Sequence, residues 1–503
     1  MKENMTSNQY KKICECCDSL LLSNETSDER VAINWLHVIR EHPIYLKEYK
    51  NLLHPVGLYQ KIKLYFLQDI YNIIRFIYYL TSVFFSTQKK SQISSHIPNK
   101  CDILFVSHLI NEKHLDNDKD FYFGDLPDKL SKFNITSIVS LINHIEKYDK
   151  KSGKELTDEK SARIVLGRKL GFVDEVSIFY KQFREYLRLR RHERKVDGLL
   201  KLVTSRARQE SITLRTHSTM IIATQIGNLI RKYNPKMVIT TYEGHSWERL
   251  VFSVARKVSP NIQCIGYQHA AIYQLQHSIR RKLAKQYNPN QILTSGEVST
   301  RLLEESKGLK GIKISLLGSC RHVVGLVKDY KRINTLKKCL VLPEGHIDEC
   351  RFLFKFSLDC ALKLPNVQFI WRLHPLINFS QIIRDNNKFK NLPDNIMLSS
   401  NSLEKDIQAS SCVLYRGSTA VIQSIVSGLR PFYVRNKNEM SIDPLYELEN
   451  GCDTVESTDD FIRAFYDNGF NHNDMKSVIR YCQKFFTPLD ASVLVNIITD
   501  RDL

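Results

Sequence analysis

The feature that most constrains the fold is a repeated alternation, from Cys101 onward, of a short apolar run, a polar loop and a helical pattern. The first series contains "CDILFVSHL", "ITSIVSLINH", "MVITTYEGH", "IQCIGYQHA", "QILTSGE" and "IKISLLGS". These runs are apolar on both faces, which is typical of parallel strands covered by helices on both sides. The pattern predicts an α/β fold with a doubly wound parallel sheet.

The alternation restarts after "LLGSCRH" with "KCLVLPEGH", "NVQFIWRLHP", "NIMLSS", "CVLYRGST" and "RPFYV", which predicts a second doubly wound domain. We expect a first Rossmann-like domain at 101–330, with an arginine-rich helical insert at about 145–235, and a second at 331–503 with closing helices. In open parallel sheets a ligand lies outside the carboxyl ends of the strands. Two such domains in tandem imply a cleft lined by the loops that follow each run.

Residues 1–100 are expected to form a helical region. Their most apolar stretch, "LYFLQDIYNIIRFIYYLTSVFF" at 64–85, is about long enough to span a bilayer. Polar and charged residues interrupt it, Asp69 and Arg75 among them, and this disfavours a spanning helix. Two interpretations stay open: a helix that lies at a membrane interface, with lysines on both sides of it, and a helix packed on the protein's own core.

The net charge of the chain indicates which classes of partner it can bind. Lysine plus arginine number 73 against 54 aspartate plus glutamate, a net charge of +19 that favours nucleic acid, an anionic membrane face or phosphorylated substrates. The most basic stretch, residues 183–209, carries leucines and valines at helical spacing and no nucleic-acid-binding motif, so we expect no nucleic-acid partner. The same basic face suits an anionic leaflet.

The cysteines indicate neither metal nor disulfides. Of the twelve, only Cys14, Cys16 and Cys17 cluster, and no second pair of ligands follows at a matching spacing, so we expect no metal site. The chain opens without the pattern of a secretory signal. We therefore expect reduced thiols and a cytoplasmic location, with peripheral attachment to the inner face of the cytoplasmic membrane if residues 57–90 contact lipid.

The corner "YRGSTA" predicts a phosphate site. Gly417 lets the backbone turn tightly, and Ser418 and Thr419 stand where a helix N-terminus would attract an anion. Arg416 would add a planar, charged fork. The alternative is an ordinary helix N-cap, which serine and threonine favour without any ligand. Neither a P-loop nor a dinucleotide-binding glycine motif is present.

Other strand ends carry residues suited to group transfer. A carboxylate or imidazole can take a proton from an attacking hydroxyl, and fixed positive groups stabilise a leaving phosphate. Glu243 could instead pair with Arg249 or His245, and His269 could be a core histidine. The candidates are Glu243 and His269 as bases, Arg372 and His374 as further phosphate ligands, and Glu344 and His346 as contacts to the nucleotide base or ribose.

These motifs resemble those of the GT-B glycosyltransferases. The acidic "EGH" at Glu243, the "HP" at His374 and the Ser418–Thr419 pair are most similar to the bacterial enzymes that use CMP-activated sugars, the sialyltransferases and Kdo transferases. The CDP-glycerol-type polymer transferases look similar. The resemblance implies that Glu243 is the base and that His374, Ser418 and Thr419 bind the donor phosphate.

The resemblance also implies a metal-independent transfer, with no cofactor, of a nonulosonic or ulosonic acid from a CMP-sugar. The acceptor would be a surface polysaccharide or a lipid-linked saccharide. Two departures from the pattern matter: Tyr242 stands where a second carboxylate is usual, and "YQHAA" around His269 is closer to the polymer transferases. A sugar-nucleotide epimerase of the same architecture and a basic membrane- or nucleic-acid-binding scaffold without activity remain the alternatives.

Overall fold

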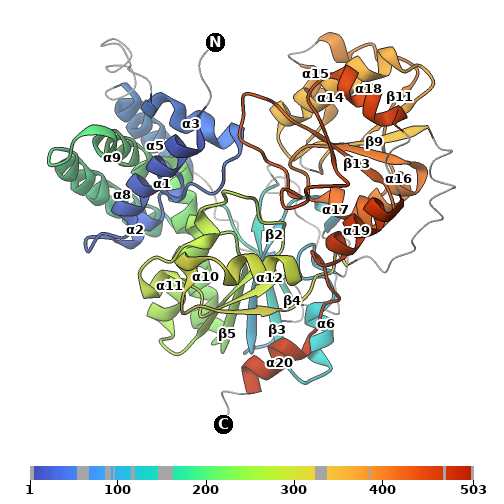
Figure 1. Ribbon diagram of the computed structural model, residues 1–503. Coiled ribbons are helices and arrows are strands. Elements are labelled where there is room, and N and C mark those ends of the chain that lie inside the picture. The colour runs from blue at the N-terminus through green and yellow to red at the C-terminus, as the bar shows by residue number, and fades with distance from the viewer. Residues whose placement is uncertain are drawn as a thin grey trace.

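The computed structural model describes residues 5–53, 67–84, 92–93, 97–114, 119–145, 162–322, 337–375, 377–384, 387–467 and 472–499. They form two domains with parallel sheets and a helical lobe beside the first domain (Figure 1). The predicted architecture of two doubly wound α/β domains is confirmed.

The first sheet has the strand order β1-β4-β3-β2-β5-β6-β7-β8. All pairs are parallel except that of the short β1 (Gln92–Ile93) with β4. The order reverses between β2 and β5, which is where a ligand is expected. The other strands are β2 (Ile103–Leu109), β3 (Ser137–Asn143), β4 (Ala162–Val165), β5 (Met237–Thr241), β6 (Gln263–Gln268), β7 (Gln291–Thr294) and β8 (Lys313–Leu316).

The segment expected as a helical insert contains a strand as well. Residues 162–165 form β4 and extend the sheet beside β3, with Ile164 and Val165 buried. A strand of four residues between polar segments has too short an apolar run to stand out in the sequence. Three helices follow β4: α8 (Phe172–Glu193), α9 (Gly198–Ser211) and α10 (Leu214–Tyr233), the last of which packs against α11 (Ser246–Val258) next to the sheet.

The N-terminal helices pack against α8 and α9. Tyr10 of α1, Trp35, Leu189 of α8 and Val203 of α9 belong to one buried cluster. The described amino-terminal helices are thus tied to the insert of the first domain through a shared core. These helices are α1 (Ser7–Leu21), α2 (Asp28–Val31), α3 (Pro43–Leu53) and α5 (Gln68–Phe84).

The second sheet has the order β11-β10-β9-β12-β13-β14, is parallel throughout and reverses between β9 and β12. Trp371 stacks on Phe354 at 4.3 Å between ring centroids in its core. Its strands are β9 (Lys338–Leu342), β10 (Gln368–Trp371), β11 (Ile396–Leu398), β12 (Cys412–Tyr415), β13 (Arg430–Val434) and β14 (Asp453–Val455). Its helices include α14 (Ile347–Lys363), α15 (Phe379–Ile383), α16 (Leu403–Ala409), α17 (Ala420–Val426), α18 (Thr458–Tyr466) and α19 (His472–Gln483).

The chain returns to the first domain after α19. The N–H of Val298, in α12 (Glu297–Glu304), donates to the carbonyl of Lys484 at 3.2 Å, and Ser319 donates to Thr487 at 2.9 Å. Helix α20 (Ser492–Thr499) then buries Leu494 and Ile498 against the first sheet, next to α6 (Leu126–Ser131) in Figure 1. The closing helices are therefore divided between the domains, because the apolar side of α20 covers first-domain core.

Candidate active site

The points where the two sheets reverse meet at the junction of the domains. In the first sheet, β2 carries His108 near its carboxyl end and β5 is followed by Glu243. In the second, β9 is followed by Glu344 and β12 by Gly417. The hydroxyl of Tyr273, which follows β6, donates a hydrogen bond to the carbonyl of Gly417 across the junction. Both expected ligand positions therefore face one site.

The loop that carries Glu243 is held by its own helix. The carboxylate of Glu248, in the first turn of α11, accepts hydrogen bonds from the backbone N–H groups of Glu243 (3.1 Å), Gly244 (2.7 Å) and His245 (2.8 Å). Gly244 has φ +84°, and a Cβ there would lie 2.5 Å from the carbonyl of Ser278. This fixed turn leaves the carboxylate of Glu243 beside His245, with 3.3 Å between Oε2 and Nε2.

The charges around this loop are coupled. Burial raises the pKa of Glu243, but the hydrogen bond with His245 and the neighbouring positive groups, Arg40 included, outweigh burial and hold it well below its usual range. Burial lowers the pKa of His245, but the carboxylates of Glu243 and Glu248 outweigh it, so that pKa is raised. Glu243 is thus an ionised carboxylate that orients an imidazole of increased basicity.

The partner of Glu243 is therefore His245 and not Arg249, the other partner that the sequence left open. Arg249 is buried in α11 and donates to the backbone carbonyls of Ser278 at 2.8 Å and Arg281 at 2.9 Å. It fixes the segment that packs against Gly244, so its role is structural.

His269 lies at the same edge of the sheet, directly after β6. Burial lowers its pKa to about 4, so the imidazole is neutral near pH 7. Its ring meets that of Tyr122 edge-on at 4.6 Å, and Nδ1 has no hydrogen-bond partner among the described residues. A neutral imidazole with an open nitrogen is able to accept a proton.

A histidine that sequence reasoning missed lies next to it. Nδ1 of His108 is 2.9 Å from Nε2 of His144, and Nε2 of His108 is 3.0 Å from the hydroxyl of Thr241. Both histidines occur at the ends of apolar runs, in "VSHL" and "LINH". That position is the signal that could have identified them.

The amino-terminal segment supplies further residues that the sequence did not indicate. Arg40 donates a hydrogen bond to Glu344, and Nε2 of His42 lies 2.6 Å from the second oxygen of that carboxylate. Burial opposes ionisation of Glu344, but Arg40 and His42 outweigh it and lower its pKa to about 2. The Arg40 guanidinium also lies 4.7 Å from the ring centroid of Tyr273 and contributes to the lowered pKa of Glu243, so it stands between the two domains.

Of the predicted second-domain residues, His374 and His346 lie beside the Glu344 loop. A Cβ on Gly345 would lie 2.8 Å from Nδ1 of His374, so the missing side chain makes room for that ring. Burial lowers the pKa of both histidines. Nε2 of His346 is 3.2 Å from the hydroxyl of Tyr45.

Ser418 and Thr419 follow Gly417, which has φ +69°. Thr419 occupies the N-cap position of α17, but its side chain makes no capping hydrogen bond. The ordinary N-cap interpretation therefore does not hold for Thr419. Because α17 has seven residues, any anion here would depend on the hydroxyls more than on a helix dipole.

The two arginines predicted at the phosphate are engaged elsewhere. Nη1 of Arg416 lies 2.9 and 2.7 Å from the two oxygens of Glu349, and Nη2 contacts Glu439. Nη1 of Arg372 lies 2.7 Å from the carboxylate of Asp406. Carboxylates bind both Nη atoms of Arg416, whereas among the described residues Arg372 is held through Nη1 alone. Both arginines hold the loops that carry His374 and Ser418, and a direct contact of either with a phosphate stays a prediction.

Arg321 lies near the site, although no motif in the sequence marks it as a candidate. It follows β8 in the connection between the domains, and its charge contributes to the lowered pKa of both His269 and His374, after burial in each case. One guanidinium is thus near a candidate base of the first domain and a candidate phosphate ligand of the second.

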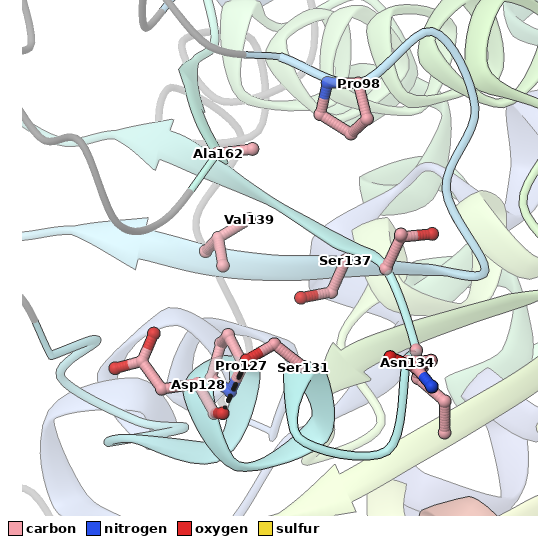
Figure 2. A pocket seen from close by; sticks show the side chains of 10 residues that line it. Pro98, Pro127, Asp128, Ser131, Asn134, Ser137, Val139 and Ala162 are labelled. Carbon is pink, nitrogen blue, oxygen red and sulfur yellow. Dashed lines mark hydrogen bonds between the residues drawn. The ribbon is translucent and has the colours of Figure 1, made fainter.

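A pocket of about 400 Å³ lies away from this site. Figure 2 shows Ser137 and Ala162, at the amino ends of β3 and β4, on one side of it, and Pro127, Asp128 and Ser131 of α6 on the other. It is at the opposite end of the strands from His108 and Glu243 and contains none of the predicted site residues.

Comparisons with known proteins do not identify an activity for this chain, so its function is inferred from the residues of the site. No family model matches the chain, and no curated protein matches it. Similar solved structures include the glycotransferase of kitacinnamycin (TM-score 0.45, 11% identity, 80% of this chain and 100% of that chain covered). Others are UDP-GlcNAc 2-epimerase from Methanocaldococcus jannaschii (0.45, 12%, 79% and 99%) and Acinetobacter baumannii MurG (0.41, 8%, 79% and 99%). At these TM-scores the similarities carry no argument about activity.

Proposed function

We propose that the protein is a GT-B glycosyltransferase that moves a sugar from a nucleotide-activated donor to an acceptor hydroxyl. One observation carries the proposal: the reversal points of both sheets meet, with Glu243, His245 and His269 on the first-domain side and with His374, Ser418 and Thr419 on the second. Glycosyl transfer needs both, because the attacking hydroxyl loses a proton as the leaving phosphate gains charge.

In this proposal the acceptor oxygen bonds to the anomeric carbon, the bond from that carbon to the phosphate oxygen breaks, and the hydroxyl proton passes to the enzyme. The Glu243–His245 pair is the first candidate acceptor of that proton, since above the raised pKa of His245 the ring is neutral and the carboxylate orients it. His269 is the second, as a neutral imidazole with an open Nδ1.

The donor phosphate would lie against His374, Ser418 and Thr419, with Arg321 supplying a fixed positive charge. Arg372 and Arg416 act indirectly, by holding the loops. Glu344 and His346 lie next to His374, where the ribose or base of the nucleotide would be. We propose that no metal takes part.

The motif resemblance supports a CMP-linked nonulosonic or ulosonic acid as donor and a surface-polysaccharide or lipid-linked saccharide as acceptor. The proposal puts this reaction in the cytoplasm. A CDP-glycerol or CDP-ribitol polymer transferase is the second candidate, because "YQHAA" around His269 favours it. A UDP-sugar epimerase is the third and would need no acceptor.

A thermal-shift panel of CMP, CDP and UDP, with EDTA present throughout, tests the donor site. A nucleotide at 100 times its Kd stabilises the folded protein by about 2.7 kcal/mol, which is visible in the melting temperature. We expect CMP to stabilise the wild type, and His374→Ala to lose that stabilisation while Asp348→Asn, an exposed change on α14, keeps it.

If CDP stabilises the protein more than CMP does, the result favours a polymer transferase. If UDP stabilises it most, the result favours a UDP-sugar enzyme. If no nucleotide shifts the melt, the donor-site proposal fails and the scaffold alternative takes its place. Stabilisation that survives His374→Ala would leave a nucleotide site but remove it from His374.

A further inference from the structure

Helices α5 and α8 expose an unusual number of large apolar side chains. Tyr78 is 76% exposed, Ile74 60% and Val173 79%. Folded proteins rarely leave large continuous apolar patches in water unless these bind something. The full set is Leu67, Ile70, Tyr71, Ile74, Ile77, Tyr78 and Phe84 from the α5 region, with Phe172, Val173, Val176, Tyr180 and Phe183 from α8.

The two helices lie side by side, so these residues share one surface. Phe76 of α5 stacks on Phe179 of α8 at 4.1 Å between ring centroids. Phe84 meets Phe172 edge-on at 5.3 Å. Both members of this second pair are exposed, which makes the patch continuous from one helix to the other.

Helix α5 is apolar on its outer side as well as its inner side, because Phe76 and Val83 are buried while Ile74 and Tyr78 are exposed. Asn72 is buried and donates a hydrogen bond to the carbonyl of Gln209, and Asp69 pairs with Arg208. Asp69 and Asn72 are therefore turned toward the protein, whereas Arg75 is exposed together with Ile74 and Tyr78. A helix that only covered the protein's own core would expose mainly polar side chains on its outer side.

Most of the exposed charges beside this patch are positive, although Asp174 in the first turn of α8 is an exposed carboxylate next to Val173. Between Val176 and Glu193 the exposed charged residues of α8 are Lys181, Arg184, Arg190 and Arg191. The nearby carboxylate of Glu175 is buried and paired with His217. The surface thus joins an apolar, aromatic region to a cationic one on a chain whose net charge is +19.

We propose that the α5–α8 face docks flat on an anionic lipid bilayer. Aromatic and aliphatic side chains enter the headgroup region while arginines contact anionic headgroups, which is how interfacial helices bind. No helix among the described residues is long and apolar enough to cross a bilayer, so the contact is with one leaflet. In Figure 1, α5 and α8 lie at the outer edge of the molecule, away from the second domain, which stays free of the membrane. The inference does not depend on the proposed sugar transfer.

Flotation with lipid vesicles tests this proposal on the full-length protein. We expect the wild type to float with vesicles of phosphatidylcholine and phosphatidylglycerol, more weakly with phosphatidylcholine alone, and less at high salt. The double variant Ile74→Asn/Tyr78→Asn should lower the partition coefficient on the order of tenfold. Arg190→Glu/Arg191→Glu should cause a similar loss only with the anionic vesicles.

The matched control is Leu362→Asn/Tyr466→Asn, which removes a similarly exposed aliphatic and aromatic residue, 65% and 54% exposed, from the second domain. It should float as the wild type does. Absence of wild-type flotation, or equal flotation of the Ile74/Tyr78 variant, would overturn the proposal. A dimer in sedimentation experiments that only the Ile74/Tyr78 variant loses, without vesicle binding, would instead assign the face to a second copy of the chain.

Discussion

The same tripeptide, Glu-Gly-His, follows a buried strand in each domain, at 243–245 and at 344–346. The first copy is completed locally, because Glu248 binds its backbone and Glu243 pairs with His245. The second copy is completed by residues about 300 positions away, because Glu344 pairs with Arg40 and His346 contacts Tyr45. Tertiary partners, more than the local sequence, therefore decide whether such a carboxylate is available to a substrate or joins two parts of the molecule.

The largest expected effect is on catalysis. Glu243→Gln removes the carboxylate that orients His245, and should lower kcat by a factor on the order of 10² to 10⁴, the usual range for general acid–base catalysis. The measurement is the transfer rate with the CMP-sugar donor, together with the CMP thermal shift, which should not change. An undiminished rate would assign proton transfer to His269 and would contradict a catalytic role for the Glu-Gly-His segment at 243–245.

The second Glu-Gly-His segment, at 344–346, is expected to contribute to the stability of the fold. Glu344→Gln leaves Arg40 without its counter-charge, and we expect a loss of about 3 kcal/mol in the free energy of unfolding, measured with denaturant. The control is Asp348→Asn, which breaks the exposed 2.7 Å pair with Lys47 between the same two segments. That change should cost less than about 1 kcal/mol.

Glu344→Gln also tests how the free energy of unfolding depends on acidic pH. The pKa of Glu344 is lowered from 4.5 to about 2 in the folded protein, so its contribution is fully present above pH 4.5 and is lost as the pH falls toward 2. This amounts to about 3 kcal/mol. Glu344→Gln should flatten the fall in stability over that interval, and an unchanged slope would mean that the pair with Arg40 is not formed in solution.

Alanine substitutions at Gly244 and Gly345 distinguish the effect of backbone strain from that of side-chain crowding. Gly244→Ala would place a Cβ 2.5 Å from a backbone carbonyl at φ +84°, and should destabilise the fold by about 3 kcal/mol. At Gly345 the nearest atoms to an added Cβ belong to the side-chain ring of His374, at 2.8 Å, so Gly345→Ala should cost about 1 kcal/mol. Thermal unfolding compares the two, and only Gly345→Ala should weaken CMP binding, because it displaces His374. Equal losses of stability would contradict this distinction.

The smallest expected effect is the pH dependence of the first copy. Because the pKa of His245 is raised in the folded protein, the protonated ring contributes stability that is fully present below its ordinary value of 6.5. That contribution is lost as the pH rises through the folded pKa. His245→Asn should remove this part of the stability profile above pH 6.5, whereas His346→Asn should not, since the pKa of His346 is lowered.

The sequence by itself determined the two sheets and the position of most candidate residues. Runs that are apolar on both faces specify covered parallel strands, and the residues after each run must lie at the carboxyl edge of a sheet. This rule placed Glu243, His269, Glu344 and His374 at the domain junction. It also accounts for one of the misses, since His108 stands at the end of such a run.

Only the tertiary structure decided which side chains meet. Arg40 reaches Glu344 across 304 positions, Arg416 is bound by Glu349 and Glu439, and α20 covers the first sheet from the far end of the chain. Likewise, only the structure showed that Phe76 of the apolar stretch is buried while Ile74 and Tyr78 are exposed, and contact of that exposed side with a membrane stays a proposal. The physical reason is that periodicity records which face of an element is apolar, whereas ion pairs and docked helices depend on the distance between elements after folding.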